Sequence, residues 1–104
     1  LQQQYFYELW TLKEACLKAV GSGLVLPLDG FSFDLSQPRQ LHMGVAKSVQ
    51  SSAHWQVWQL EFDAQYELAI ALHSPGRIRM RVSSWHCVGF QATEKRNWPI
   101  RRQL

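Results

Sequence analysis

The chain of 104 residues is short enough for one small domain, and its 46% hydrophobic content and five tryptophans suffice for a core. Its net charge of +3 is uneven, because residues 1–76 hold four basic and seven acidic side chains while residues 77–104 hold seven basic and one acidic. The basic quarter favours an anionic partner. No apolar run approaches the roughly 20 residues of a membrane span, no secretory signal opens the chain, and the four histidines lack zinc-ligand spacing. Two unpatterned cysteines, Cys16 and Cys87, are typical of a reducing, cytoplasmic setting, with one disulfide left open.

Residues 5–20 are predicted to form a helix, because apolar side chains recur at steps of three and four: Phe6, Leu9, Leu12, Cys16 and Ala19. Gly21 and Gly23 are placed to close the helix, and Pro27 prevents it from resuming. The opening LQQQYFY offers no capping residue and no initiator methionine. We therefore expect the native polypeptide to extend upstream.

The rest of the chain is predicted to be mainly β-structure. Alternating apolar residues indicate strands over residues 31–35, 41–47, 54–62, 66–72 and 77–82. A change of phase between Val57 and Trp58 indicates a β-bulge, and the DAQ and SPG sequences indicate turns. The predicted fold class is α+β, with one main helix packed on an antiparallel sheet of three to four strands. Residues 1–93 would form this domain, followed by a mobile basic tail at residues 94–104.

The predicted helix carries the sequence KEACLK, in which a carboxylate is flanked by two lysines. Glu14 and Lys18 lie about 40° apart on one helix face, and Lys13 lies on a neighbouring face. A carboxylate is a hard oxygen ligand for Mg²⁺, and a lysine one turn away suits a phosphate. The alternative is a solvated ion pair that contributes roughly 0.2–0.5 kcal/mol to helix stability.

The stretch WTLKEACLKAVGSGL resembles the third signature motif of the surfactin-type 4′-phosphopantetheinyl transferases, with Trp10, Lys13, Glu14, Ala15, Lys18, Gly21 and Gly23 at its positions. The similarity continues into LPLDGFSFDL and, more weakly, into YELAIALHS. The resemblance implies transfer of the phosphopantetheine arm of coenzyme A to a serine of an acyl or peptidyl carrier protein, which leaves 3′,5′-ADP.

The resemblance also implies a role for each matched residue. Glu14 would bind Mg²⁺ and, in some mechanisms, help to deprotonate the acceptor serine. Lys18 would contact the coenzyme A phosphates, with Lys13 beside them. Trp10 would be a packing residue that fixes the helix.

Enzymes of this type have two similar halves, and the first half supplies further metal carboxylates in an Asp-x-Glu-type motif. That motif does not occur here, and a second metal site at Glu61 and Asp63 competes with an ordinary polar strand face. The chain is therefore expected to be a C-terminal half, inactive alone, whose partners are the N-terminal half of the same enzyme and an acidic carrier protein.

Two further features of the sequence allow more than one interpretation. Arg77, Arg79 and Arg81 indicate either a charged edge strand or a docking surface for an acidic partner. Trp55, Trp58, Trp85 and Trp98 have basic residues nearby and could stack bases, but the tryptophans of residues 54–62 alternate into a presumed core, which favours core packing. The alternative function is a noncatalytic basic α+β domain that binds nucleic acid or an acidic protein; neither nucleic acid nor a membrane is the expected partner of the transferase.

Overall fold

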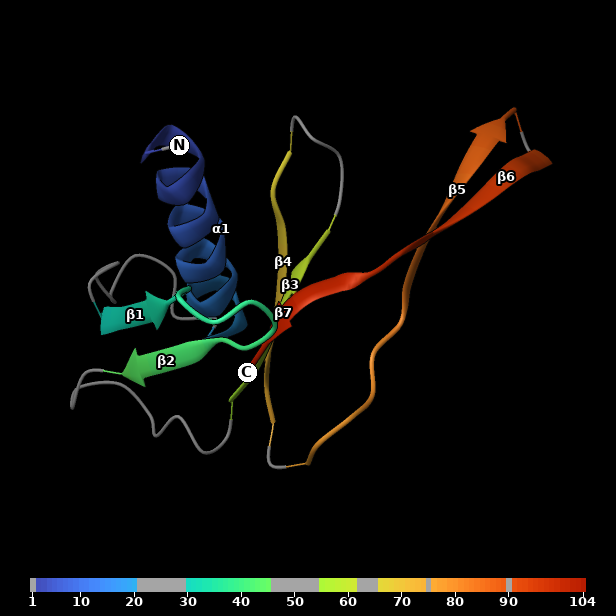
Figure 1. Cartoon of the computed structure of the whole chain (residues 1–104). Helices are drawn as coiled ribbons and strands as arrows, with labels where there is room; N and C mark the ends of the chain where they lie inside the picture. The colour runs from blue at the N-terminus through green and yellow to red at the C-terminus, as the bar shows by residue number, and fades with distance from the viewer. Residues whose placement is uncertain (1, 21–29, 46–54, 62–65, 75, 90) are drawn as a thin grey trace.

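The computed structural model describes residues 2–20, 30–45, 55–61, 66–74, 76–89 and 91–104. These residues form one helix, α1 (Gln2–Val20), followed by the strands β1 (Phe31–Asp34), β2 (His42–Val45), β3 (Trp55–Leu60), β4 (Leu68–His73), β5 (Val82–Val88), β6 (Gln91–Trp98) and β7 (Ile100–Gln103). The strands pair as three antiparallel sheets, β1–β2, β4–β3–β7 and β5–β6. Figure 1 shows α1 beside the central sheet, the β1–β2 pair across the C-terminal end of the helix, and the β5–β6 ribbon extending away from both.

The α+β class is confirmed, because the helix packs on an antiparallel sheet of three strands. The helix predicted over residues 5–20 is confirmed and begins at Gln2. The strands predicted over 31–35, 41–47, 54–62 and 66–72 are confirmed with bounds that differ by up to two residues. The DAQ turn and the glycines that follow the helix lie outside the described residues.

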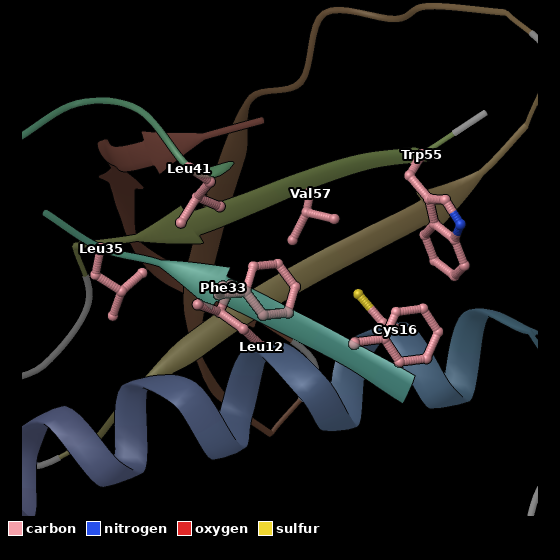
Figure 2. Close-up of a cluster of buried hydrophobic side chains, with 8 residues drawn as sticks. Leu12, Cys16, Phe33, Leu35, Leu41, Trp55 and Val57 are labelled. Atoms are coloured by element: carbon pink, nitrogen blue, oxygen red, sulfur yellow. The ribbon is translucent and has the colours of Figure 1, made fainter. Parts of the chain in front are cut away.

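The hydrophobic core lies between α1, β1 and β3. It is formed by Leu12, Cys16, Phe31, Phe33, Leu35, Leu41, Trp55 and Val57, most of which Figure 2 labels. Phe31 meets Trp55 edge-on, with their ring centroids 5.3 Å apart. Cys16 is free and fully buried, so it forms no disulfide with Cys87. Burial raises the pKa of the Cys16 thiol to about 12, which suits an inert packing residue.

The buried face of α1 differs from the predicted stripe. The buried residues are Glu8, Leu12 and Cys16, which follow one another at steps of four. Leu9 and Ala19 are partly buried against the core, but Phe6 remains 56% exposed. Glu8 is therefore buried where periodicity assigned an apolar stripe that includes Phe6, and its carboxylate pairs with the partly buried Arg101 and Arg102 of β7.

Strand β3 is buried on both faces, and this explains why its large apolar residues do not all fall on alternate positions. Trp55 and Val57 face the helical core, whereas Gln56 and Trp58 line a pocket whose wall includes residues 77–80. The Gln56 side chain accepts a hydrogen bond from the Ile78 amide at 3.0 Å and donates one to its carbonyl at 3.2 Å. The bulge predicted between Val57 and Trp58 is wrong, because β3 pairs with β4 in continuous register and shifts register only against β7, between Gln59 and Leu60.

The C-terminal quarter departs most from the sequence prediction. Residues 77–81 form an irregular connection and not a strand, so the charged edge strand predicted there is wrong. The mobile tail predicted for residues 94–104 is also wrong, since β6 pairs with β5 and β7 pairs with the central strand β3. The other edge of β7 is also bonded, because the Leu41 amide donates to the Gln103 carbonyl at 2.9 Å.

A buried ionic cluster fastens β7 to the helix. The Glu8 carboxylate lies 3.1 Å from Arg101 and 3.7 Å from Arg102. Arg101 also lies 3.8 Å from Glu67, and Arg102 donates to the buried Gln59 side chain at 2.7 Å. These contacts desolvate both arginines in part, and they explain why a basic terminal segment is ordered here.

Glu67 gives the cluster a testable pH dependence. Burial raises the pKa of the Glu67 carboxyl, an effect that Arg101 opposes and the Glu8 charge reinforces. An acid with a raised folded pKa stabilises the fold relatively more at low pH, and this advantage is lost as pH rises through the folded pKa. Glu67→Gln should therefore gain stability relative to the natural chain as pH is raised from below the ordinary value of 4.5 to 7. Urea titrations of both chains at several pH values measure this difference, and a difference that moved the other way would contradict it.

Candidate active site

Glu14 and Lys18 lie on the side of α1 that faces away from the sheet. At about 100° per residue, Glu14 is about 160° around the helix from the buried Leu12, and Lys18 stands in the same relation to Cys16. Glu14 is half-buried and Lys18 is exposed, so both side chains are accessible from outside. The helix that packs the core thus holds a carboxylate and an ammonium group on its outer face.

The two charges do not form the ion pair that the simpler interpretation required. Among the described residues, ion pairs within 4.0 Å join Glu8 to Arg101 and Arg102, and Arg101 to Glu67; none involves Glu14 or Lys18. No side-chain hydrogen bond is formed by Glu14 with any described residue either. The carboxylate therefore keeps its oxygen lone pairs for an external ligand.

Lys13 lies on the flank of the helix, about 100° from Glu14, where it is half-buried. It can reach a ligand held at the outer face only from the side. The structure therefore brings Glu14 and Lys18 together on one face and leaves Lys13 at its border.

Aromatic side chains continue the outer face toward the start of the helix. Trp10 precedes Glu14 by four residues, is 45% exposed, and stacks on Phe6 with ring centroids 6.0 Å apart. Tyr7 is 49% exposed and meets Phe6 edge-on. Trp10 is not part of the core cluster of the described residues, and the expectation that it packs to fix the helix stays a prediction for the complete enzyme. Sequence periodicity missed this surface, although the four-residue step from Trp10 to Glu14 was a visible signal.

The described residues place no set of further metal ligands beside Glu14. No group of three or more His, Cys, Asp or Glu residues among them is placed to hold a metal ion. Glu61 is exposed just after β3, and Asp63 lies outside the described part of the chain. A cation bound at Glu14 therefore needs further ligands from a substrate or another part of the protein.

Comparison with known proteins decides the family. A family model described as the 4′-phosphopantetheinyl transferase superfamily matches residues 1–71, which include the whole of α1 and its KEACLK sequence. The chain belongs to this superfamily. The matched range ends within β4, so the transferase match leaves out β5, β6 and β7.

Several curated transferases are similar to this chain. The 4′-phosphopantetheinyl transferase Sfp of Bacillus subtilis is 38% identical over 74 residues, covering 71% of this chain and 32% of its own length. The human L-aminoadipate-semialdehyde dehydrogenase-phosphopantetheinyl transferase is 35% identical over 85 residues, covering 75% of this chain and 27% of its own. The chain thus spans about a third of the length of these relatives or less. No solved structure gives a match.

The superfamily match fits the accessible face of α1 but tests no individual residue. The structure shows where the motif residues of this transferase domain lie, and the roles of Glu14, Lys18 and Lys13 remain predictions. Within the described residues, no helix is both long and apolar enough to span a membrane.

Proposed function

We propose that this chain is part of an enzyme that transfers the 4′-phosphopantetheine group of coenzyme A to a serine of an acyl or peptidyl carrier protein, with Mg²⁺ as cofactor. The observation that carries the proposal is the superfamily match over residues 1–71. The matched range includes an outer helix face on which Glu14 lies beside Lys18 and forms no ion pair with any described residue. In the transfer, the serine oxygen bonds to the phosphorus that carries the pantetheine arm, and the bond from that phosphorus to 3′,5′-ADP breaks.

Each motif residue would then have a defined task. Glu14 would hold the cation through its free carboxylate oxygens and would be placed to accept the proton of the serine hydroxyl. Lys18, exposed one turn further along, would pair with a phosphate oxygen of coenzyme A as a compact point charge. Lys13 would approach the same phosphates from the flank.

The donor set agrees with a hard cation. A carboxylate with no protein partner on an accessible face is suited to Mg²⁺, which prefers oxygen ligands and fills its coordination with substrate phosphates and water. Mg²⁺, when bound there, would neutralise diphosphate charge and stabilise the leaving ADP. Glu14 supplies one of several ligands, so the others would come from coenzyme A and from the rest of the polypeptide.

The partners follow from the same reasoning. Because the relatives are about three times longer than their matched parts, we propose that an N-terminal half of the same enzyme completes the site. The acceptor would be an acidic carrier protein. A free, buried Cys16 is compatible with a reducing compartment, and we place the enzyme in the cytoplasm. The noncatalytic alternative is not favoured, because the relatives described above are named as phosphopantetheinyl transferases.

The proposal is tested by incubating the complete enzyme with coenzyme A, Mg²⁺ and an apo carrier protein. Mass spectrometry should show one phosphopantetheine group added to the carrier, with an equal amount of 3′,5′-ADP released. The 104-residue chain alone should show no transfer, because one carboxylate cannot complete the coordination of Mg²⁺. No modification by the complete enzyme, with a carrier that other transferases modify, would overturn the proposed function.

Lys18→Ala should weaken coenzyme A binding without unfolding the protein. Lys18 is exposed and forms no ion pair with the described residues, so its removal should change stability by less than about 0.5 kcal/mol. A lost charged contact to phosphate should raise the KM for coenzyme A roughly tenfold or more. The matched control is Arg39→Ala, which removes an exposed cation away from the helix and should leave this KM unchanged. Equal KM values for all three proteins would remove Lys18 from the phosphate site.

A further inference from the structure

The basic side chains of the C-terminal quarter fall into two groups with different environments. Arg101 and Arg102 are held by Glu8 and Glu67 in the ionic cluster on β7. The other group is exposed and forms no ion pair with any described carboxylate: Arg77, Arg79, Arg81, Lys95 and Arg96. Residues 77–98 contain Glu94 as their one acidic residue. The charge left for a partner is therefore concentrated on this second group.

Lys95 and Arg96 lie on the β5–β6 ribbon, whereas Arg77, Arg79 and Arg81 lie on the connection that leads to it, whose Ile78 is hydrogen-bonded to Gln56 of β3. We call the ribbon and this connection, residues 77–98, the arm. Figure 1 shows the ribbon leaving the central sheet and ending far from the helix. Its strands pair from Val82 opposite Trp98 to Val88 opposite Gln91, and Gly89, which directly follows β5, takes a positive φ of 62°. The ribbon, residues 82–98, lies beyond residues 1–71, over which the family model matches.

Two tryptophans hold cations at the surface of the arm. Lys95 lies directly opposite Trp85, and its ammonium nitrogen is 5.6 Å from the ring centroid. The Arg96 guanidinium lies 4.6 Å from the Trp98 ring, whose indole nitrogen donates to the Ser84 hydroxyl at 2.8 Å. The negative face of each ring attracts the cation that lies over it. The cations already cover part of each ring, which leaves less aromatic surface for stacking a nucleic-acid base.

We propose that the arm is the docking surface for the acidic carrier protein. Lys95 and Arg96 are neighbours in β6, so they supply cations on opposite faces of the ribbon, and Arg77, Arg79 and Arg81 add positive charge on the connection. The proposal rests on the proposed function, which makes a carrier protein the acceptor substrate. Its support is charge: residues 77–98 contain five exposed cations and a single acidic residue, and cations at a surface recognise carboxylates of a protein partner. The arm would attract and orient the carrier while the chemistry takes place at the helix.

The test measures binding separately from transfer. The complete enzyme is titrated into a fluorescently labelled acyl carrier protein whose acceptor serine is replaced by alanine, so that no group can be transferred. The double variant Lys95→Glu, Arg96→Glu should raise Kd at least tenfold at low salt. The natural enzyme should bind more weakly as salt is raised, and the double variant should show a smaller salt dependence. Lys95→Arg with Arg96→Lys keeps both charges and should bind nearly normally, whereas Arg39→Glu is the control for an exposed cation elsewhere.

The remaining outcomes distinguish failure of the docking-surface proposal from failure of the proposed transferase function. Unchanged Kd in the charge-reversed variant overturns the docking surface, while transfer by the natural enzyme leaves the proposed function intact. Arm-dependent carrier binding without any transfer by the natural enzyme overturns the proposed function and supports the docking surface. Tighter binding of a single-stranded oligonucleotide than of the carrier protein at physiological salt overturns the docking surface in favour of a nucleic-acid partner.

Discussion

Replacing Glu14 by glutamine in the complete enzyme is expected to lower kcat/KM by roughly a hundredfold or more, about 2.7 kcal/mol at the transition state. The amide keeps the shape of the side chain but loses the charge that would hold the cation and accept the serine proton. Glu14 is half-buried and has no ion pair among the described residues, so the change should leave the fold intact. Steady-state rates of carrier modification measure the effect.

The control for this experiment is Glu61→Gln, which neutralises an exposed carboxylate at the end of β3. It should retain near-normal kcat/KM. A folded Glu14→Gln enzyme with normal turnover would show that the carboxylate takes no part in the reaction. Loss of activity in both variants to the same degree would show a general sensitivity to charge.

Glu8→Ala is expected to destabilise the fold by about 3 kcal/mol, at the lower end of the range for a broken buried ion pair. The carboxylate side chain is 10% exposed and lies against two arginines, which would lose their shared partner. Arg101 keeps a contact with Glu67 at 3.8 Å, and Arg102 keeps its bond to Gln59, so the loss is partial. Urea unfolding measures the free energy.

Hydrogen exchange should locate the damage from Glu8→Ala at β7. The Leu41 and Leu104 amides, which donate to Gln103 and Val57, should exchange faster than in the natural chain. The matched change Glu61→Ala removes an exposed carboxylate and should cost less than about 0.5 kcal/mol. A cost below 1 kcal/mol for Glu8→Ala would mean that β7 is held by its backbone pairing alone.

The local parts of the fold could be predicted from the sequence because their patterns are local. Alternation over residues 66–72 and helical spacing over residues 5–20 each require only neighbouring side chains. The contacts of Glu8 could not be predicted, because its partners lie more than ninety residues away on β7. Periodicity therefore assigned the buried stripe to apolar residues, including Phe6, and treated the distant arginines as part of a mobile tail.

The arm was missed for a different reason. Its strands are rich in polar residues, and none of the ribbon residues whose burial is described is buried, so they lack the apolar alternation that marks a strand packed on a core. One sequence signal for a hairpin was present: Gly89, a residue typical of tight turns, lies between the seven residues of β5 and the eight residues of β6. Residues 77–81 gave the opposite error: their alternating sequence predicted a strand, but they form an irregular connection that is hydrogen-bonded to Gln56 through Ile78.

The candidate site was predicted mainly from the resemblance of its motif to that of the transferases, and less from the spacing and charge of its residues. The spacing of Glu14 and Lys18 fits an ordinary surface ion pair as well as a phosphate site. The structure adds that the two do not pair within the described residues and that both face away from the core. The roles of Glu14 as a cation ligand and of Lys18 as a phosphate contact stay predictions, which the variants described above test.

The most direct test of the central claim is a calorimetric titration of coenzyme A into the complete enzyme, with and without Mg²⁺, for the natural protein and for Glu14→Gln. If the Glu14 carboxylate holds the cation against the coenzyme A phosphates, Mg²⁺ should strengthen binding to the natural enzyme at least tenfold and have little effect on the variant. Equal strengthening by Mg²⁺ in both proteins would contradict the assignment of Glu14 as a metal ligand.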